Sequence, residues 1–315
     1  MGIFFKSISG ILIVLIMIIL GFVLAKRHWF NDDSTNLIVK LVIDVALPCY
    51  MIYTIGHDFT ADTLLSTLPD LRFPVVSMLI MFGISVAIAR VIRIKKYHRG
   101  LFESMFLNSN TVFVGLPVNM ALFGAQSLPY VLVYYMANTT FFWTIGVYLI
   151  QMDGDANSKF DWKKTIGKIL SPPLLGFIIG VILVLLRIKL PSFLMSDFQY
   201  VGNLTIPLSM MFIGISMANV NLAKFDLSAS NWGILLGRFI ISPSLMALLV
   251  IPTGMPILMK QVFIMQAAMP VMTNAPIVAR KYGADADYAS LMVTETTIIS
   301  LIVLPILMVI VQQIH

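Results

Sequence analysis

Long apolar runs, separated by short polar interruptions, fill almost the whole sequence. Each run is long enough for a helix of about 20 residues, the length that crosses the hydrocarbon core of a bilayer. Within lipid, a helix satisfies all of its own backbone hydrogen bonds. The runs therefore predict an all-α integral membrane protein with about ten transmembrane helices. They lie near 8–25, 35–56, 71–92, 101–123, 129–151, 168–188, 198–219, 231–252, 257–280 and 287–311.

Ten spans leave little of the chain for a soluble domain. Of its 315 residues, 59% are hydrophobic and only 11% are charged, whereas soluble domains carry about a quarter charged residues. We therefore expect no catalytic domain and no enzyme activity. Cys49 is the only cysteine, so neither an internal disulfide nor a thiolate metal cluster is expected.

The distribution of Lys and Arg predicts the orientation. Fourteen of these residues lie in connections that follow odd-numbered runs, and five lie in the even-numbered connections or at the N-terminus. Basic residues stay on the cytoplasmic side, so both termini should face outward across the cell membrane. The net charge of +6 is then loop charge, and no nucleic acid is expected as a partner.

A polar connection at 152–167 divides the chain almost in half. It predicts a first five-helix repeat at 1–151, a cytoplasmic linker at 152–167 and a second repeat at 168–315. Five is an odd number, so the second repeat should be inverted. One offset of 159 residues matches four Pro or Gly pairs, where about one is expected by chance. The pairs are Pro48 with Pro207, Pro117 with Pro276, Gly21 with Gly180, and Gly124 with Gly283.

Two runs, 101–123 and 257–280, carry proline together with Asn and Thr. Proline removes a backbone donor and clashes with the preceding turn, so both helices should break near mid-membrane. A lone proline commonly means only a kink, but two at repeat-equivalent positions favour a binding site. Broken helices present N–H groups and positive dipole ends, which suit an anion. The expected substrate-binding residues are Asn110, Thr111, Gly115, Pro117, Pro270, Thr273, Asn274 and Pro276.

Four segments resemble the auxin efflux carrier family. They are NTVFVGLP at 110–117, MPVMTNAP at 269–276, SPPLLGFIIG at 171–180 and DVALPCYM at 44–51. The short central loop is similar to that of bacterial members, which are commonly labelled malate or malonate permeases. The resemblance implies a ten-helix transporter in which helices 4 and 9 cross at their prolines and a mobile domain slides past a scaffold.

Ionisable residues inside the runs should face the protein interior or water, because a charge at the bilayer centre costs about 3 kcal/mol. Glu295 lies among threonines and could bind a proton or Na⁺. Asp44 is either functional or the partner of Lys40 in an i, i+4 ion pair. Arg238 either neutralises Glu295 or extends to the cytoplasmic side. The candidates for ion coupling are Glu295, Asp44 and Asn138, and no cofactor other than H⁺ or Na⁺ is expected.

The expected function is secondary transport of a small mono- or dicarboxylate, such as malate, by alternating access. The transport is either coupled to H⁺ or Na⁺ or driven by the anion's own gradient. The alternatives are an anion channel of the same fold and a membrane sensor that transports nothing. An intramembrane hydrolase would need paired aspartates, a Ser and His set or an H-E-x-x-H motif, and the runs contain none of these. The expected partners are a small organic anion and the lipid bilayer, with a homodimer as an open alternative to a monomer.

Overall fold

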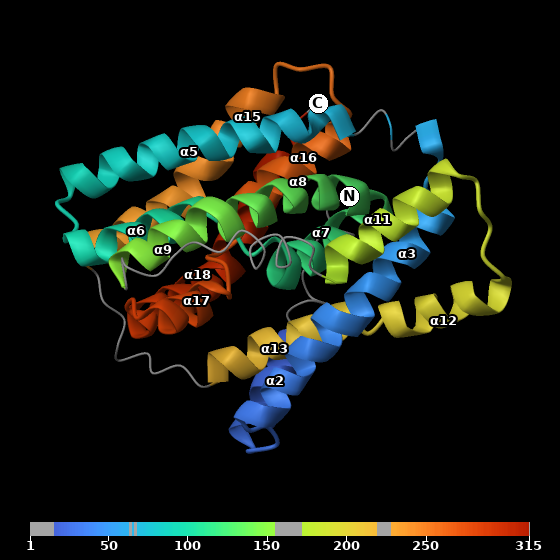
Figure 1. Ribbon diagram of the computed structural model, residues 1–315, viewed down its shortest axis with the longest axis horizontal. Coiled ribbons are helices and arrows are strands. Elements are labelled where there is room, and N and C mark those ends of the chain that lie inside the picture. Colours follow the sequence, from blue (N-terminus) through green and yellow to red (C-terminus); the bar gives the residue numbers. More distant parts are fainter. Residues whose placement is uncertain (1–15, 63–64, 66–67, 155–171, 219–227, 315) are drawn as a thin grey trace. The chain divides into compact units, whose positions relative to one another are not determined.

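The computed structural model describes residues 16–62, 65, 68–154, 172–218 and 228–314 (Figure 1). These residues are helical, with no strand beyond one isolated β-bridge, so the all-α prediction is confirmed. The start of the first apolar run and most of the predicted linker lie outside the described residues. Within the described ranges, five helical stretches are long and apolar enough to cross a membrane: Asp33–His57, Pro69–Val91, Ser192–Ile215, Ala229–Val250 and Ala286–Val311.

The helices follow the apolar runs closely, with shorter 3₁₀- and π-helical pieces, marked η, between them. A helix at Ile16–Lys26 comes first. The others are α2 (Asp32–Lys40), η1 (Leu41–Ala46), α3 (Leu47–Asp58), η2 (Leu68–Leu71), α5 (Arg72–Val91), α6 (Lys96–Leu107), η3 (Thr111–Gly115), α7 (Leu116–Phe123), η4 (Ala125–Ser127), α8 (Leu128–Phe141), η5 (Phe142–Gly146), α9 (Val147–Asp153), α11 (Pro172–Leu185), α12 (Ser192–Gly202), α13 (Thr205–Ala218), α14 (Ala229–Leu236), η7 (Gly237–Ile241), α15 (Ser242–Val250), α16 (Ile257–Ala267), α17 (Ala275–Tyr282) and α18 (Ala286–Val311).

The chain forms two compact units, and each draws segments from both halves of the sequence. The first unit contains Met1–Pro69, Val112–Val133 and Leu170–Val220, and the second contains the remaining segments, Asp70–Thr111, Tyr134–Ile169 and Asn221–His315. Spatial units and sequence repeats are therefore different divisions of this chain. The two five-helix repeats stay a prediction.

In the first unit, glycines let helices approach to backbone contact. A Cβ atom on Gly21 would overlap the carbonyl oxygen of Met211 in α13. On α11, which lies beside α3 in Figure 1, a Cβ on Gly180 would lie 3.0 Å from the Cβ of Ile55 in α3. Small residues at such contacts are the usual means of tight helix packing in membranes.

We expect Gly21→Ala to destabilise the protein. The added methyl group must displace the backbone of Met211, and overpacking of this kind costs about 1–3 kcal/mol. The matched control is Gly83→Ala in α5, where an added Cβ has no atom within 4 Å. That change should stabilise its helix by about 0.5–1 kcal/mol. Thermal unfolding midpoints in detergent test the pair, and equal midpoints for the two variants would contradict the close contact.

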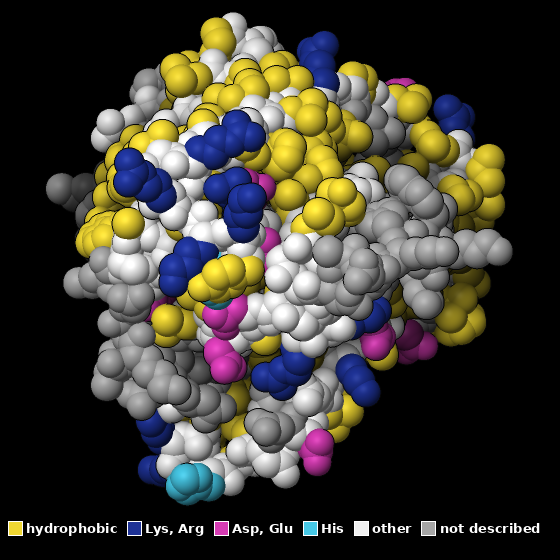
Figure 2. All heavy atoms as spheres, turned by 60° about the vertical axis from the view of Figure 1, so that its left-hand side comes forward, with side chains coloured by type: hydrophobic (Ala, Val, Ile, Leu, Met, Phe, Trp, Pro, Cys, Tyr) yellow, Lys and Arg dark blue, Asp and Glu magenta, His cyan; other side chains and the backbone are white. Residues whose placement is uncertain are grey.

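In the second unit, three connections that the sequence places on the cytoplasmic side lie together. The Nδ1 atom of His98 in α6 is 3.7 Å from Oδ2 of Asp285, just before α18. The carboxylate of Asp153, at the end of α9, accepts hydrogen bonds from the backbone N–H groups of Gly100 (2.9 Å) and Leu101 (2.6 Å). Burial raises the pKa of Asp153 above its ordinary value, and these two donors lower it in part. Figure 2, which brings the left-hand side of Figure 1 forward, shows Lys and Arg side chains with acidic ones among them.

Candidate functional site

Two helices are interrupted, as the sequence predicts, and both interruptions lie in the second unit. The first interruption separates the end of α6 from η3, and the second separates α16 from α17. The backbone N–H of Asn110 donates to the carbonyl of Pro270 at 2.8 Å, and Ser109 forms an antiparallel β-bridge with Val271. The two interrupted segments therefore meet at residues 109–110 and 270–271, which we call the junction.

Local sequence explains the interruptions. Residues 108–110, Asn-Ser-Asn, have side chains that compete for backbone hydrogen bonds and favour turns over helix. Pro270 disfavours helical geometry in the residue before it. Both interruptions precede Pro117 and Pro276 in the sequence. Pro117 and Pro276 lie in the first turns of α7 and α17, where proline is well tolerated, so Pro270 is the proline at the junction.

Arg238, in η7, holds the ends of both interrupted helices. Its guanidinium is completely buried and donates to four main-chain carbonyls. The last carbonyls of a helix have no partner within the helix and carry its negative dipole end, so a buried cation here satisfies and neutralises both ends together. The acceptors are Phe106 (3.2 Å) and Leu107 (3.0 Å) at the end of α6, Ala267 (2.6 Å) at the end of α16, and Met269 (3.1 Å) just beyond it.

Neither role proposed for Arg238 from the sequence is observed. A fully buried guanidinium does not extend to the cytoplasmic side. Its hydrogen bonds go to carbonyl oxygens, and no ion pair joins it to Glu295 among the described residues.

Asn138, on α8, completes the junction with its side-chain amide. Its Oδ1 accepts from the backbone N–H of Ser109 at 3.0 Å, and its Nδ2 donates to the carbonyl of Ser109 at 2.8 Å. Nδ2 also lies 3.5 Å from Oγ1 of Thr111. The amide thus pairs with Ser109 as a neighbouring strand would. Asn138, a candidate for ion coupling, therefore fixes the position of the Ser109 backbone.

Two further polar side chains support the same backbone. Nε2 of Gln266 donates to the carbonyl of Thr111 at 3.4 Å. Oγ1 of Thr296 in α18 accepts from the N–H of Val271 at 3.1 Å. Both residues were missed in the sequence, where each is only a polar residue within an apolar run.

The structure brings some of the expected substrate-binding residues together at the junction. Asn110, Thr111 and Pro270 are buried there. Thr273 and Asn274 follow it and are partly exposed. Asn274 precedes the first turn of α17 and makes no side-chain cap bond to that helix. The two remaining positions on the first interrupted helix, Gly115 and Pro117, belong to the first unit.

The two carboxylates proposed for ion coupling lie in different units and different environments. Glu295 is 1% exposed, and its Oε2 accepts from Nδ2 of Asn231 at 3.1 Å. Asp44 lies in η1 and is exposed. No ion pair joins Asp44 to Lys40 in the described part of the chain. Nor do its His, Cys, Asp and Glu residues form a group of three that could hold a metal ion.

Comparisons with known proteins cover nearly the whole chain. The sequence profile of a family described as "Membrane transport protein" matches residues 7–308. An uncharacterized transporter of Methanocaldococcus jannaschii is 26% identical over 303 residues, which cover 93% of this chain and 95% of that protein. An uncharacterized transporter of Methanothermobacter thermautotrophicus is 26% identical over 310 residues, covering 96% of this chain and 98% of that protein.

Proposed function

Because the chain belongs to the membrane transport protein family, the auxin efflux carrier-like family that its motifs resemble, we propose that it is a secondary transporter of a small organic anion. The substrate is a mono- or dicarboxylate such as malate, which crosses the cell membrane by alternating access. Either coupling to H⁺ or Na⁺ or the gradient of the anion itself drives the movement. The observation that carries this proposal is the junction of two interrupted helices.

The charges at the junction favour an anion. The Arg238 guanidinium donates hydrogen bonds to carbonyls at the ends of α6 and α16, so its charge neutralises the negative dipole ends of these two helices. The N-terminus of α17 keeps its positive dipole end, with no side-chain cap from Asn274. Backbone N–H groups at such a terminus, with neutral amide and hydroxyl donors nearby, suit a carboxylate. No second arginine is needed at this position.

Backbone conformation supports the proposed pair of inverted five-helix repeats at 1–151 and 168–315. Gly124 and Gly283, which are 159 residues apart, both have a positive φ (76° and 75°), although their ψ angles differ (−175° and 17°). His28 and Arg187, separated by the same 159 residues, have φ angles of 58° and 55° at the ends of the first helix of each half. A left-handed conformation is uncommon for a residue other than glycine, so its recurrence at His28 and Arg187 supports two repeats of one design. We also propose that both termini lie outside, as the distribution of Lys and Arg predicts.

We expect Asn274→Ala to weaken substrate binding. The change removes a donor that compensates the carboxylate for its lost hydration, which costs on the order of 1–3 kcal/mol, or roughly five- to 150-fold in affinity. Asn110→Ala should act in the same direction. The matched control is Asn203→Ala, at an exposed position after α12.

Counterflow of radiolabelled mono- and dicarboxylates, malate among them, into proteoliposomes measures this effect. Saturable counterflow in the wild type, with a raised half-saturation concentration only in Asn274→Ala and Asn110→Ala, is the expected result. A unitary conductance far above carrier turnover would mean an anion channel instead. Unchanged half-saturation in both variants would move the binding site away from the junction.

A further inference from the structure

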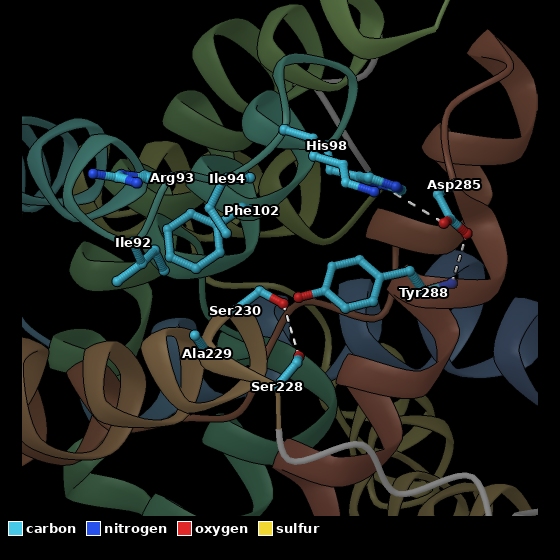
Figure 3. A pocket seen from close by; sticks show the side chains of 11 residues that line it. Ile92, Arg93, Ile94, His98, Phe102, Ser228, Ala229, Ser230, Asp285 and Tyr288 are labelled. Atoms are coloured by element: carbon cyan, nitrogen blue, oxygen red, sulfur yellow. Dashed lines mark hydrogen bonds and ion pairs between the residues drawn. The ribbon is translucent and has the colours of Figure 1, made fainter.

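Three parts of the second unit line a cavity of about 380 Å³. They are the connection between α5 and α6 with the start of α6, the start of α14, and the start of α18 (Figure 3). The distribution of Lys and Arg predicts that these helix ends face the cytoplasm. Pockets that hold small molecules have volumes of about 300–1,000 Å³, so the cavity is large enough for an organic ligand.

Hydrogen-bonding side chains line two sides of this cavity. The hydroxyl oxygens of Ser228 and Ser230 lie 2.9 Å apart, and Figure 3 shows the Tyr288 hydroxyl directed toward them. On another side, Nδ1 of His98 lies 3.7 Å from Oδ2 of Asp285, which is too long for a hydrogen bond. A serine hydroxyl rotates to suit its partner. The two serines can therefore donate to the oxygen atoms of a ligand.

The charged residues that line the cavity favour an anion. Arg93 and Lys95 carry permanent positive charges, and both are exposed at its rim. Arg93 extends away from the centre in Figure 3, but a side chain of this length and exposure can fold back over a ligand. Asp285 is the acidic residue of the lining, and its Oδ1 accepts from the backbone N–H of Tyr288 at 2.9 Å. Two cations against one carboxylate attract negative charge.

An apolar wall lies next to the basic rim. Ile92, Ile94 and Phe102 form it on one side of the cavity (Figure 3). A bare inorganic anion gains nothing from such a wall, whereas the organic part of an ester buries apolar surface against it. The lining therefore fits a ligand with an anionic group and an organic group.

We propose that this cavity binds a phosphate ester. Arg93 and Lys95 pair with the phosphate, the two serine hydroxyls donate to it, and the organic part lies against Phe102. A guanidinium matches phosphate geometry with two parallel hydrogen bonds, and basic pockets between membrane helices on the cytoplasmic side bind lipid head groups. A phospholipid head group and a soluble phosphate ester share this chemistry. The proposed site is distinct from the junction and does not depend on the transport function.

The chain contains a matched control for the basic rim. The segment Arg-Ile-Lys at 93–95 recurs at 187–189. The arginine has a positive φ in both copies, 58° and 55°, and the N–H of the isoleucine closes the preceding helix with a hydrogen bond of 2.9 Å in both. The second copy belongs to the first unit and does not line the cavity. Identical changes in the two copies therefore separate the cavity from surface charge.

The experiment measures thermal unfolding midpoints of the full-length protein in detergent. The probes are sn-glycerol 3-phosphate and, separately, phosphatidylglycerol added to the micelles. Glycerol and phosphatidylcholine, which carry no net charge, are their controls. We expect at least one probe to raise the midpoint of the wild type by about 5 °C at about 100 times its dissociation constant.

Two double variants test the basic rim. Arg93→Gly with Lys95→Gln should raise the dissociation constant of the active probe at least about tenfold. Glycine suits the positive φ at this position, so the midpoint without probe should not fall. Arg187→Gly with Lys189→Gln makes the same changes in the first unit and should bind the probe as wild type does.

Asp285→Asn tests the charge balance in the opposite direction. Asparagine keeps the cap at the start of α18 and removes the negative charge beside the site. We expect the probe to bind about two- to fivefold more tightly, as measured by the same midpoints over a range of probe concentrations.

The outcomes identify the source of the phosphate or overturn the site. Stabilisation by glycerol 3-phosphate indicates a soluble ester, and stabilisation by phosphatidylglycerol alone indicates a lipid head group. If neither probe acts, the cavity binds no phosphate ester of either kind and the proposal is wrong. Equal losses in the two double variants would assign the effect to surface charge. That result, or binding that does not tighten in Asp285→Asn, also overturns the proposal.

Discussion

Replacing Arg238 by Met should strongly destabilise this protein. Four buried carbonyls would lose their donor, and an unsatisfied buried acceptor costs about 1–3 kcal/mol. Even with relaxation, a loss on the order of 5 kcal/mol is expected, a large part of the total stability of a typical protein. The thermal unfolding midpoint of the purified protein in detergent measures the effect, and we expect it to fall by about 10 °C or more.

Lys260 provides a matched control for this change. Lys260 is also a buried residue, but its ammonium group donates to a single carbonyl, that of Ile251, at 3.0 Å. Lys260→Met should therefore cost only about 1 kcal/mol. Arg238→Lys should lie between the two, because an ammonium group keeps the charge but lacks the planar five-donor geometry. If Arg238→Met and Lys260→Met unfold at the same temperature, the guanidinium does not hold the two helix ends.

Asn138→Leu should abolish substrate binding by releasing the backbone at the junction. The substitution leaves the N–H and the carbonyl of Ser109 without the amide that pairs with both. Two unsatisfied backbone groups in a buried position cost about 2–6 kcal/mol together. Because Asn110 follows directly, its side chain would lose its position as well. We expect carboxylate affinity to fall by more than about 100-fold.

Substrate-dependent thermal stabilisation measures the loss without requiring transport. Thr140→Val, two residues further along α8, is the control, since its exposed hydroxyl donates only to the carbonyl of Met136 in its own helix. That variant should bind as wild type does. Full ligand stabilisation in Asn138→Leu would show that the junction keeps its geometry without the amide, and would return Asn138 to the list of candidates for ion coupling.

The sequence predicts the helices and the two interruptions because both depend on local chemistry. Apolar runs of membrane-spanning length favour helices, and the Asn-Ser-Asn segment and Pro270 end them. The partners of the polar side chains could not be predicted in this way. Arg238 is 131 and 132 residues from the carbonyls to which it donates in α6. Every residue has a main-chain carbonyl, so the residue type does not show which carbonyl will accept. A guanidinium that bonds to backbone therefore leaves no recognisable pair in the sequence.

The same limit applies to the compact units. Matching glycines and prolines at a fixed offset indicate order along the chain, and they say nothing of which helices pack together. Gly21 was significant in the sequence as the partner of Gly180 in a repeat. In the structure, Gly21 lets its helix approach the backbone of Met211 in α13 closely. This contact between residues far apart in the sequence cannot be read from the offset.

The guanidinium at the junction also sets an order of events during synthesis. Leu79, the residue 159 positions before Arg238, is an apolar side chain that is 52% exposed, so the proposed repeat offset gives Arg238 no basic counterpart in the first half. When α6 enters the membrane, the carbonyls of Phe106 and Leu107 still lack Arg238 as their donor. That residue leaves the ribosome only after more than 100 further residues. The junction therefore closes late in biogenesis, and the first half produced alone would insert its helices without completing this part of the protein.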